Sequence, residues 1–289
     1  MQIIKDLGEL RKCVEACRAQ EKTVGLVPTM GALHSGHLSL IRRAKSENNV
    51  CFVSIFVNPT QFNNKEDLRI YPRDLERDCE LLSCEKVDFV FAPSVSEIYS
   101  NNELSGVFDF DFGGLDATME GKQRPGHFNG VVQIVSRLFY LIRPRRAYFG
   151  EKDYQQLCII RYMVYRSSMK GTFGELYIES CPIVRDNSGL ALSSRNALLS
   201  DEERAKASNI YRILKESTAW VTELQAKRDK VKIVEEAVVR KINAIEGLKV
   251  DYFAIVECDS LQPVSSFSNA IGCIAVYCGS VRLIDNIKY

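Results

Sequence analysis

The sequence predicts an α/β protein in which a doubly wound parallel sheet is followed by a smaller α/β unit. Short apolar runs rich in β-branched residues alternate with amphipathic helical patterns, which is typical of a parallel sheet covered on both faces. The chain has 289 residues, 46% of them apolar, enough for two hydrophobic cores. We therefore expect a Rossmann-like domain at residues 1–184 and a smaller α/β domain at 185–289.

The strands of the first domain are predicted from short apolar runs, because a strand buried on both faces carries few polar side chains. In order they are residues 2–4, 23–27, 49–57, 87–91, 147–150 and 175–184, with a half-exposed strand at 107–112. Helical spacing of apolar residues predicts helices at 38–45, 74–82, 131–142 and 151–166, and an earlier one ending near residue 20. Asp74 is the expected N-cap of its helix.

The second domain is predicted from a hairpin turn at residues 185–189, two helices and three strands. Ser200 begins a capping sequence for a helix that runs to about residue 224. A charged helix follows, and three strands complete the unit. The second helix spans residues 229–245, and the strands span 250–256, 270–278 and 281–284.

Composition argues against several classes of partner. The net charge is +1, from 38 basic and 37 acidic residues, so we expect neither nucleic acid nor an anionic membrane as a partner. No apolar run is long enough to span a membrane, and the first residues lack the apolar region of a signal peptide. The ten cysteines include no C-x-x-C pair, which favours buried reduced thiols in a cytoplasmic protein.

Residues 24–37 are the most informative stretch. An apolar strand runs through a glycine-bearing loop into a helix that opens with His34 and His37, two of the three histidines. Free backbone N–H groups and the helix dipole at such a junction favour an anion, and Gly31 and Gly36 would let a ligand approach the backbone. No Walker lysine motif or G-x-G-x-x-G is present. The alternatives are a plain turn or a zinc pair, although no cysteine or acid stands at ligand spacing.

Residues 34–37 resemble the H-x-G-H signature of the nucleotidyltransferase superfamily, and residues 28–37 are similar to the pantothenate synthetase family in particular. Three later stretches also resemble that family, in the expected order: residues 54–62, 150–157 and 190–196. Leu192 replaces the family's commoner methionine, and Ser188 stands where the family tends to have aspartate. The resemblance implies an enzyme that joins pantoate to β-alanine with ATP, through an enzyme-bound pantoyl adenylate.

The resemblance also implies roles for individual residues. His34, His37 and Lys152 would be catalytic, with His37 the favoured proton donor and Lys152 beside the α-phosphate. Gln61 and Gln156 would bind pantoate or β-alanine. The implied ATP-binding residues are Met30, Gly31, Ala32, Leu33, His34, Ser35, Gly36, His37, Gly150, Glu151, Lys152, Asp153, Val184, Leu192, Ser193, Ser194 and Arg195.

Within that set, Ser193, Ser194 and Arg195 would hold the departing pyrophosphate, and Asp153 could bind the ribose. Mg²⁺ is expected with the nucleotide, and Asp78 is a candidate ligand. Arg124 and His127 match a family stretch that shapes the pantoate side of the pocket, where we expect His127 to position rather than catalyse.

Two alternatives remain at this point. Another nucleotidyltransferase would share the histidine loop but not the Gln61 and Gln156 pair. A tRNA-binding module would need a basic face or an added domain, which the charge does not favour. The resemblance further implies a homodimer with small-molecule substrates. The smaller domain is expected to act as a lid, because residues 193–195 lie at the junction of the two domains.

Overall fold

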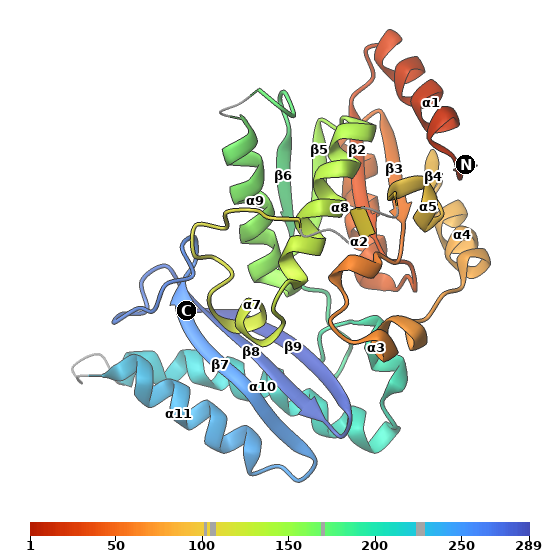
Figure 1. The fold of residues 1–289 in the computed structure, drawn as a ribbon. Coiled ribbons are helices and arrows are strands. Elements are labelled where there is room, and N and C mark those ends of the chain that lie inside the picture. Colours follow the sequence, from red (N-terminus) through yellow and green to blue (C-terminus); the bar gives the residue numbers. More distant parts are fainter. Residues whose placement is uncertain (101–102, 105–107, 169–170, 224–228) are drawn as a thin grey trace.

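The computed structural model describes residues 1–100, 103–104, 108–168, 171–223 and 229–289 (Figure 1). Its larger part is a six-stranded, all-parallel sheet with the strand order β1-β4-β3-β2-β5-β6. The predicted parallel sheet is therefore confirmed. The strands are β1 (Gln2–Ile4), β2 (Val24–Thr29), β3 (Val50–Ile55), β4 (Phe89–Phe91), β5 (Arg146–Gly150) and β6 (Tyr177–Cys181).

Helices cover both faces of this sheet, as its apolar strands require. One face packs against α1 (Leu7–Ala19), α8 (His127–Ile142) and α9 (Tyr154–Ser168). The other packs against α2 (Ser35–Glu47) and α4 (Leu75–Cys84), whose N-cap is Asp74 as predicted. The strand order reverses between β2 and β5, and parallel sheets bind ligands outside the carboxyl ends of strands at such a point.

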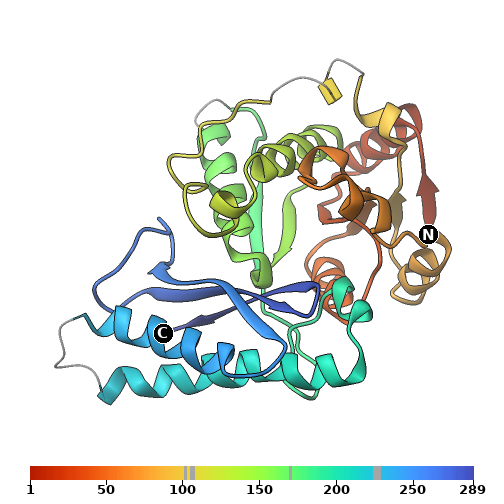
Figure 2. The ribbon, with the colours of Figure 1, turned by 60° about the horizontal axis from the view of Figure 1, so that its bottom comes forward.

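The C-terminal part is a three-stranded antiparallel sheet of β7 (Leu248–Glu257), β8 (Ala270–Cys278) and β9 (Val281–Lys288). Helices α10 (Asp201–Glu223) and α11 (Lys230–Asn243) cover one face. Figure 2 shows the sheet between these helices and the larger part of the molecule. Its second face contributes Val256, Ile271 and Cys273 to the core that contains α8 and α9. One face of the small sheet therefore packs on the core of the larger part, while its other face forms a second core with α10 and α11.

Several sequence predictions need correction. Residues 108–112 form no strand, and Val107 lies outside the described residues. The alternation there arises because aromatic side chains turn inward, with the rings of Phe110 and Phe112 5.1 Å apart. Three short helices were not predicted, because they have too few turns for a periodic pattern. They are α3 (Lys65–Ile70), α5 (Val95–Ile98) and α7 (Met119–Gln123).

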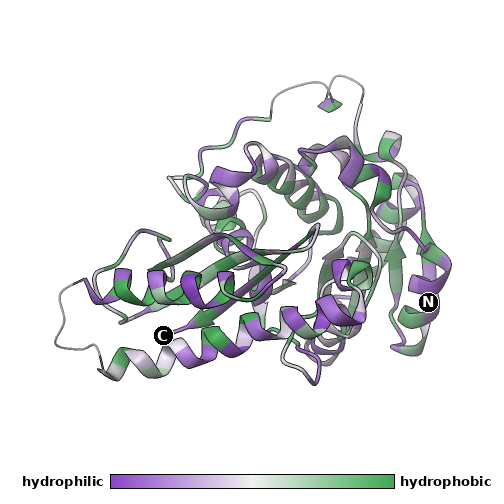
Figure 3. Cartoon of the chain, turned by 90° about the horizontal axis from the view of Figure 1, so that it is seen from below, coloured by the Kyte–Doolittle hydropathy of each residue, from purple (hydrophilic) through white to green (hydrophobic). Residues whose placement is uncertain are grey.

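Helix hydropathy and cysteine exposure are the remaining features of the fold. Hydrophilic and hydrophobic residues alternate along α10 and α11, as expected of helices with one buried face (Figure 3). Cys84 is exposed, contrary to the expectation of buried thiols, because it lies in the last turn of α4 on the face away from the sheet. Among the helices of the described residues, none is both long and apolar enough to cross a membrane.

Candidate active site

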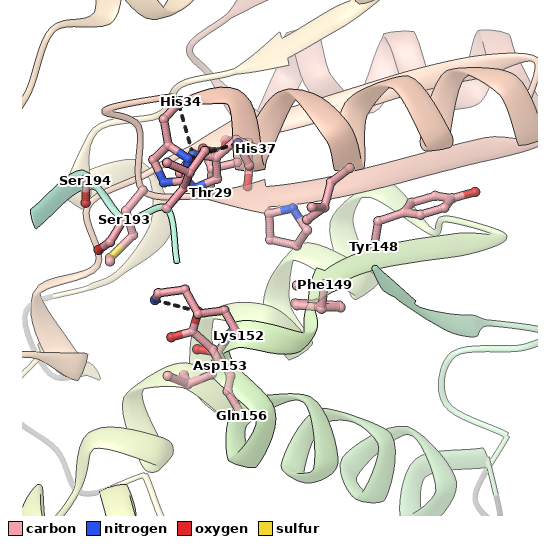
Figure 4. A pocket seen from close by; sticks show the side chains of 18 of the residues that line it. Thr29, His34, His37, Tyr148, Phe149, Lys152, Asp153, Gln156, Ser193 and Ser194 are labelled. Atoms are coloured by element: carbon pink, nitrogen blue, oxygen red, sulfur yellow. Dashed lines mark hydrogen bonds and ion pairs between the residues drawn. The ribbon is translucent and has the colours of Figure 1, made fainter. Parts of the chain in front are cut away.

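A cavity of about 230 Å³ lies where the strand order reverses, outside the carboxyl ends of β2, β3 and β5. Figure 4 shows His34 and His37 on one wall, with Lys152, Asp153 and Gln156 opposite. The predicted site residues that line it are Met30, His34, Gly36, His37, Gln61, Gly150, Lys152, Asp153, Gln156, Val184, Leu192, Ser193, Ser194 and Arg195. Those that do not line it are Gly31, Ala32, Leu33, Ser35 and Glu151.

The two histidines form a capping box at the start of α2. The backbone N–H of Gly36 donates to Nδ1 of His34 at 3.1 Å, and the backbone N–H of His34 donates to Nδ1 of His37 at 3.3 Å. The three-residue spacing of the histidines is therefore also the spacing of a helix cap. A Cβ at Gly36 would lie 2.8 Å from Cε1 of His34, so this glycine makes room for an imidazole.

Both imidazoles are neutral and carry their proton on Nε2. Burial and the positive charge of Lys152 lower the pKa of His34 to about 4. Burial, His34 and Lys152 lower the pKa of His37 to about 3. Since Nδ1 of each ring accepts a hydrogen bond from the backbone, Nε2 is the nitrogen left to donate.

The third histidine, His127, is buried and has the opposite tautomer. Its Nδ1 donates to the backbone carbonyl of Gln61 at 2.8 Å, while the guanidinium of Arg124 lies 3.1 Å from Nε2. Burial and the charge of Arg124 lower the pKa of His127 to about 4. His127 therefore holds the backbone of Gln61 without lining the main cavity, and its positioning role stays a prediction.

All three histidines are therefore expected to resist protonation. In the unfolded chain they take up protons as the pH falls through about 6.5, whereas the folded protein does not until about pH 4 or below. The free energy of unfolding should decrease as the pH falls from about 6.5 toward 4. NMR of the Cε1 protons should show no midpoint above about pH 5 in the ligand-free protein. A midpoint near 6.5 for any histidine would contradict this.

Five backbone amides of the loop, which the sequence analysis expected to be free for an anion, have partners within the protein. Ala32 and Leu33 donate to the two carboxylate oxygens of Asp78 at 2.9 and 2.8 Å. Gly31 donates to the Thr29 hydroxyl at 3.1 Å. With the cap of α2, the amides that have partners are those of Gly31, Ala32, Leu33, His34 and Gly36. These five amides are therefore committed to the protein itself.

Asp78 tethers the loop from behind, which argues against its use as a metal ligand. It is 2% exposed, and both of its oxygens accept the loop amides. Burial raises the pKa of Asp78, opposed by these hydrogen bonds. Gly31 has φ of 78°, and a Cβ there would lie 2.8 Å from Oδ2 of Asp78. Ala32 follows with φ of 50°, so the tether holds a left-handed turn.

Asp78→Asn should loosen the loop, because an amide can accept only one of the two N–H groups. The expected loss in free energy of unfolding is about 2–4 kcal/mol, because one buried N–H loses its acceptor and the other keeps only a neutral one. The matched control is Asp74→Ala, which removes the N-cap bond to the backbone of Arg77 on the same helix and should cost only about 1 kcal/mol. Urea denaturation measures both. Equal losses would show that Asp78 has no special role.

The wall opposite the histidines begins at the end of β5. Lys152 Nζ lies 3.4 Å from Oδ2 of Asp153. The neighbouring glutamines of α9 have different surroundings. Gln156 lines the cavity, whereas Gln155 is buried and donates to the carbonyls of Leu115 and Thr118. Of the two, Gln156 is the one at the main cavity, and its role as a ligand-binding residue stays a prediction.

Gln61 lines the cavity from the short helix η1 (Pro59–Gln61), which follows β3. Its Oε1 accepts from Asn58 at 3.2 Å, and its Nε2 is 3.0 Å from the sulfur of Met30. Asn58 is 1% exposed and also donates to the carbonyl of Gly130. These bonds hold the amide of Gln61 at the end of the parallel strand.

The remaining wall comes from the segment that follows β6. Leu192 donates to the carbonyl of Val184 at 3.0 Å, which closes the predicted hairpin. Ser193 caps the short helix η3 (Ser194–Leu198) by accepting from the backbone of Arg195 at 3.3 Å. Two hydroxyls and a guanidinium thus reach the cavity that also contains Lys152.

Sequence reasoning missed several lining residues. Ser54 is fully buried, and its hydroxyl has no partner among the described residues. Thr29 and Asn58 lie at the carboxyl ends of β2 and β3, a position that could have identified them. Tyr71 comes from the segment between α3 and α4; residues 71–73 also resemble the family, but that stretch was interpreted as structural. Within the described residues, no group of three or more metal-binding side chains occurs.

A Rossmann-like sheet with basic, hydroxyl and amide side chains gathered at its switch point defines an α/β enzyme for small molecules. Comparisons with known proteins point to one family. The family model of pantoate-β-alanine ligase matches residues 2–288. A pantothenate synthetase of Phocaeicola vulgatus is 52% identical over 292 residues, covering 100% of this chain and 99% of the relative. One from Thermotoga neapolitana is 46% identical, covering 99% of each chain.

Solved structures agree with the sequence comparison. The crystal structure of pantothenate synthetase from Thermus thermophilus has a TM-score of 0.89 at 42% identity, covering 100% of this chain and 99% of that one. The pantoate-β-alanine ligase of Francisella tularensis, complexed with β-γ ATP and β-alanine, has a TM-score of 0.81 at 37% identity, covering 100% and 97%. The chain belongs to the pantoate–β-alanine ligase family, and it is an enzyme that forms pantothenate from pantoate and β-alanine.

Proposed function

We propose that this enzyme drives the ligation with ATP through an enzyme-bound pantoyl adenylate. The observation that carries the proposal is the meeting of Lys152, the two histidines and the Ser193–Arg195 segment around one cavity. Cationic and hydroxyl groups surround it on several sides, as a triphosphate requires. The Francisella tularensis relative, whose structure contains β-γ ATP and β-alanine, supports the same use of the site here.

The proposed reaction has two steps. A carboxylate oxygen of pantoate attacks the α-phosphorus of ATP, and the bond to the bridging oxygen breaks as pyrophosphate leaves. The amine of β-alanine then attacks the acyl carbon, loses a proton and expels AMP. The protein needs no nucleophile of its own, because positioning and charge stabilisation suffice.

Each proposed role follows from a side chain at the cavity. His34 and His37 donate from Nε2 to phosphate oxygens, since each Nδ1 is engaged by the backbone. Lys152 stabilises the charge that develops on the α-phosphate, and Gln61 and Gln156 bind the polar groups of pantoate. Ser193, Ser194 and Arg195 receive the pyrophosphate. Mg²⁺ enters with ATP as part of the substrate, bound mainly by phosphate oxygens.

A pyrophosphate exchange assay tests this proposal. Labelled pyrophosphate should exchange into ATP only when pantoate is present, and β-alanine should be required for release of AMP. Exchange without pantoate would instead identify a different nucleotidyltransferase. Pantothenate formation from pantoate and β-alanine without any consumption of ATP would overturn the adenylate route.

We also propose that residues 185–289 form a separate domain that closes over the nucleotide, excluding water from the adenylate. The Ser193–Arg195 segment supports this, because it joins this domain to the cavity. Small-angle scattering should show compaction with ATP and pantoate, and an unchanged radius of gyration would argue against closure. A homodimer in the cytoplasm completes the proposal, and sedimentation equilibrium would test the dimer.

A further inference from the structure

Strand β9 contains two buried polar residues that the reaction outlined above does not use. Asp285 and Asn286 are each 6% exposed. They lie on the antiparallel sheet, yet their side chains contact segments from both sides of the cavity. A buried carboxylate needs an ion-pair partner and a buried amide needs hydrogen-bond partners. The segments that supply these partners indicate the structural role of the two residues.

Asn286 binds the segment that carries Lys152. Its Nδ2 donates to the backbone carbonyls of Glu151 and Lys152, at 2.8 and 3.2 Å. These residues form the short helix η2 (Glu151–Asp153), from which Lys152 projects into the cavity. One amide group therefore holds two successive carbonyls, and with them the backbone direction at Lys152.

Asp285 binds the segment that leads to the Ser193–Arg195 wall. Its carboxylate makes a two-point ion pair with Arg185, at 2.6 and 2.9 Å. Arg185 also donates to the carbonyl of Gly189 at 3.2 Å and stacks on Tyr211, with its guanidinium carbon 3.5 Å from the ring centre. A β-bridge pairs Arg185 with Ala191. Asp285 thus anchors the hairpin whose second arm continues into the hydroxyl-bearing wall.

The two anchors are coupled to each other. Oδ1 of Asp285 accepts the backbone N–H of Asn286 at 2.8 Å, so the carboxylate is fixed relative to the amide. Lys152, Ser193 and Asp285 also line one small cavity behind the main one. A continuous path of hydrogen bonds therefore runs from the backbone of Lys152 through β9 to the hairpin.

We propose that Asp285 and Asn286 are a positioning pair, which holds Lys152 and the Ser193–Arg195 wall at the separation that a triphosphate needs. The inference rests on the proposed function, since it assigns phosphate contacts to both segments. Neither residue lines the main cavity. Each acts through backbone that it fixes, and an error of about 1 Å in such a site can lower a rate about a hundredfold.

Asn286→Ala tests the pair directly, because it removes the donor while leaving the sheet register in place. The kcat for pantoate-dependent pyrophosphate exchange should fall about 10- to 100-fold, with the KM for pantoate changed by less than about threefold. The matched control is Asn243→Ala, which removes a 2.8 Å bond to the backbone of Val250 on the opposite edge strand. Its exchange rate should match that of the unaltered enzyme.

A double variant distinguishes an effect on the position of Lys152 from a general disordering of the site. In a Lys152→Ala background, Asn286→Ala should reduce exchange by no more than about twofold further, because its effect acts through Lys152. Effects that multiply in full would overturn the inference. If Asn286→Ala does not fold, as judged by circular dichroism, Asn286→Ser is used, since its side chain is too short to reach both carbonyls.

The outcomes also distinguish this inference from the proposed function. Unaltered enzyme without pantoate-dependent exchange would refute the function itself. Normal exchange in both the unaltered enzyme and a folded Asn286 variant would refute only the positioning pair.

Discussion

Replacing Lys152 with alanine is expected to lower pantoate-dependent pyrophosphate exchange by about two orders of magnitude or more. Lys152 projects into the cavity from η2, and its nearest charged partner is Asp153 at 3.4 Å. That ion pair leaves the ammonium able to turn toward a phosphate. Since a lysine is a mobile point charge, its loss removes stabilisation of negative charge that no neighbouring amide can replace.

Two further variants make the Lys152 result interpretable. Lys152→Met keeps the length of the side chain without the charge and should be as impaired as the alanine variant. Lys12→Ala, on the exposed side of α1, should leave exchange unchanged. Circular dichroism should find all three variants folded. Near-normal turnover in either Lys152 variant would refute its role.

His37→Gln is expected to lower the same exchange rate by about a hundredfold while preserving the fold. The capping box explains the choice of glutamine. A glutamine at this position can still accept the backbone N–H of His34, as in ordinary capping boxes, but it lacks the rigid imidazole that fixes a donor nitrogen at the cavity. The variant therefore separates the structural role of His37 from its proposed chemical one.

Comparison with His37→Ala completes the test. Alanine removes both roles. Its free energy of unfolding should therefore be lower than that of His37→Gln by about 1 kcal/mol, the contribution of one helix cap, and thermal denaturation should show a lower midpoint. Both variants should lose similar amounts of activity. If His37→Gln keeps near-normal exchange, the histidine serves the helix alone.

Much of the fold could be predicted because its cause is local. Apolar β-branched runs specify buried strands, and strands that alternate with helices leave few options other than a parallel sheet. The prediction failed at residues 108–112, where tertiary contacts of aromatic rings imitate the alternation of a strand. It stopped β9 at residue 284, four residues short of its end, because Asp285 and Asn286 are polar. Their burial depends on partners distant in sequence.

The site was predictable to the extent that its residues lie in short contiguous stretches. His34, Lys152 and Ser193 were found in this way, and all three line one cavity. Residues that support the site from other elements were not found in this role. Asp78 was only a candidate metal ligand, and nothing local shows that its oxygens hold a loop 45 residues earlier. Asn286 carries no local signal of its contact with residue 152.

The histidine cap has a consequence for reagents that modify the enzyme. An imidazole whose Nδ1 is committed to the backbone offers a single nitrogen to any electrophile or soft metal ion. Acylating reagents should therefore add one group to each of His34 and His37, always at Nε2, and never a second without unwinding the first turn of α2. The active site thus has a built-in regiochemistry, determined by how a helix begins.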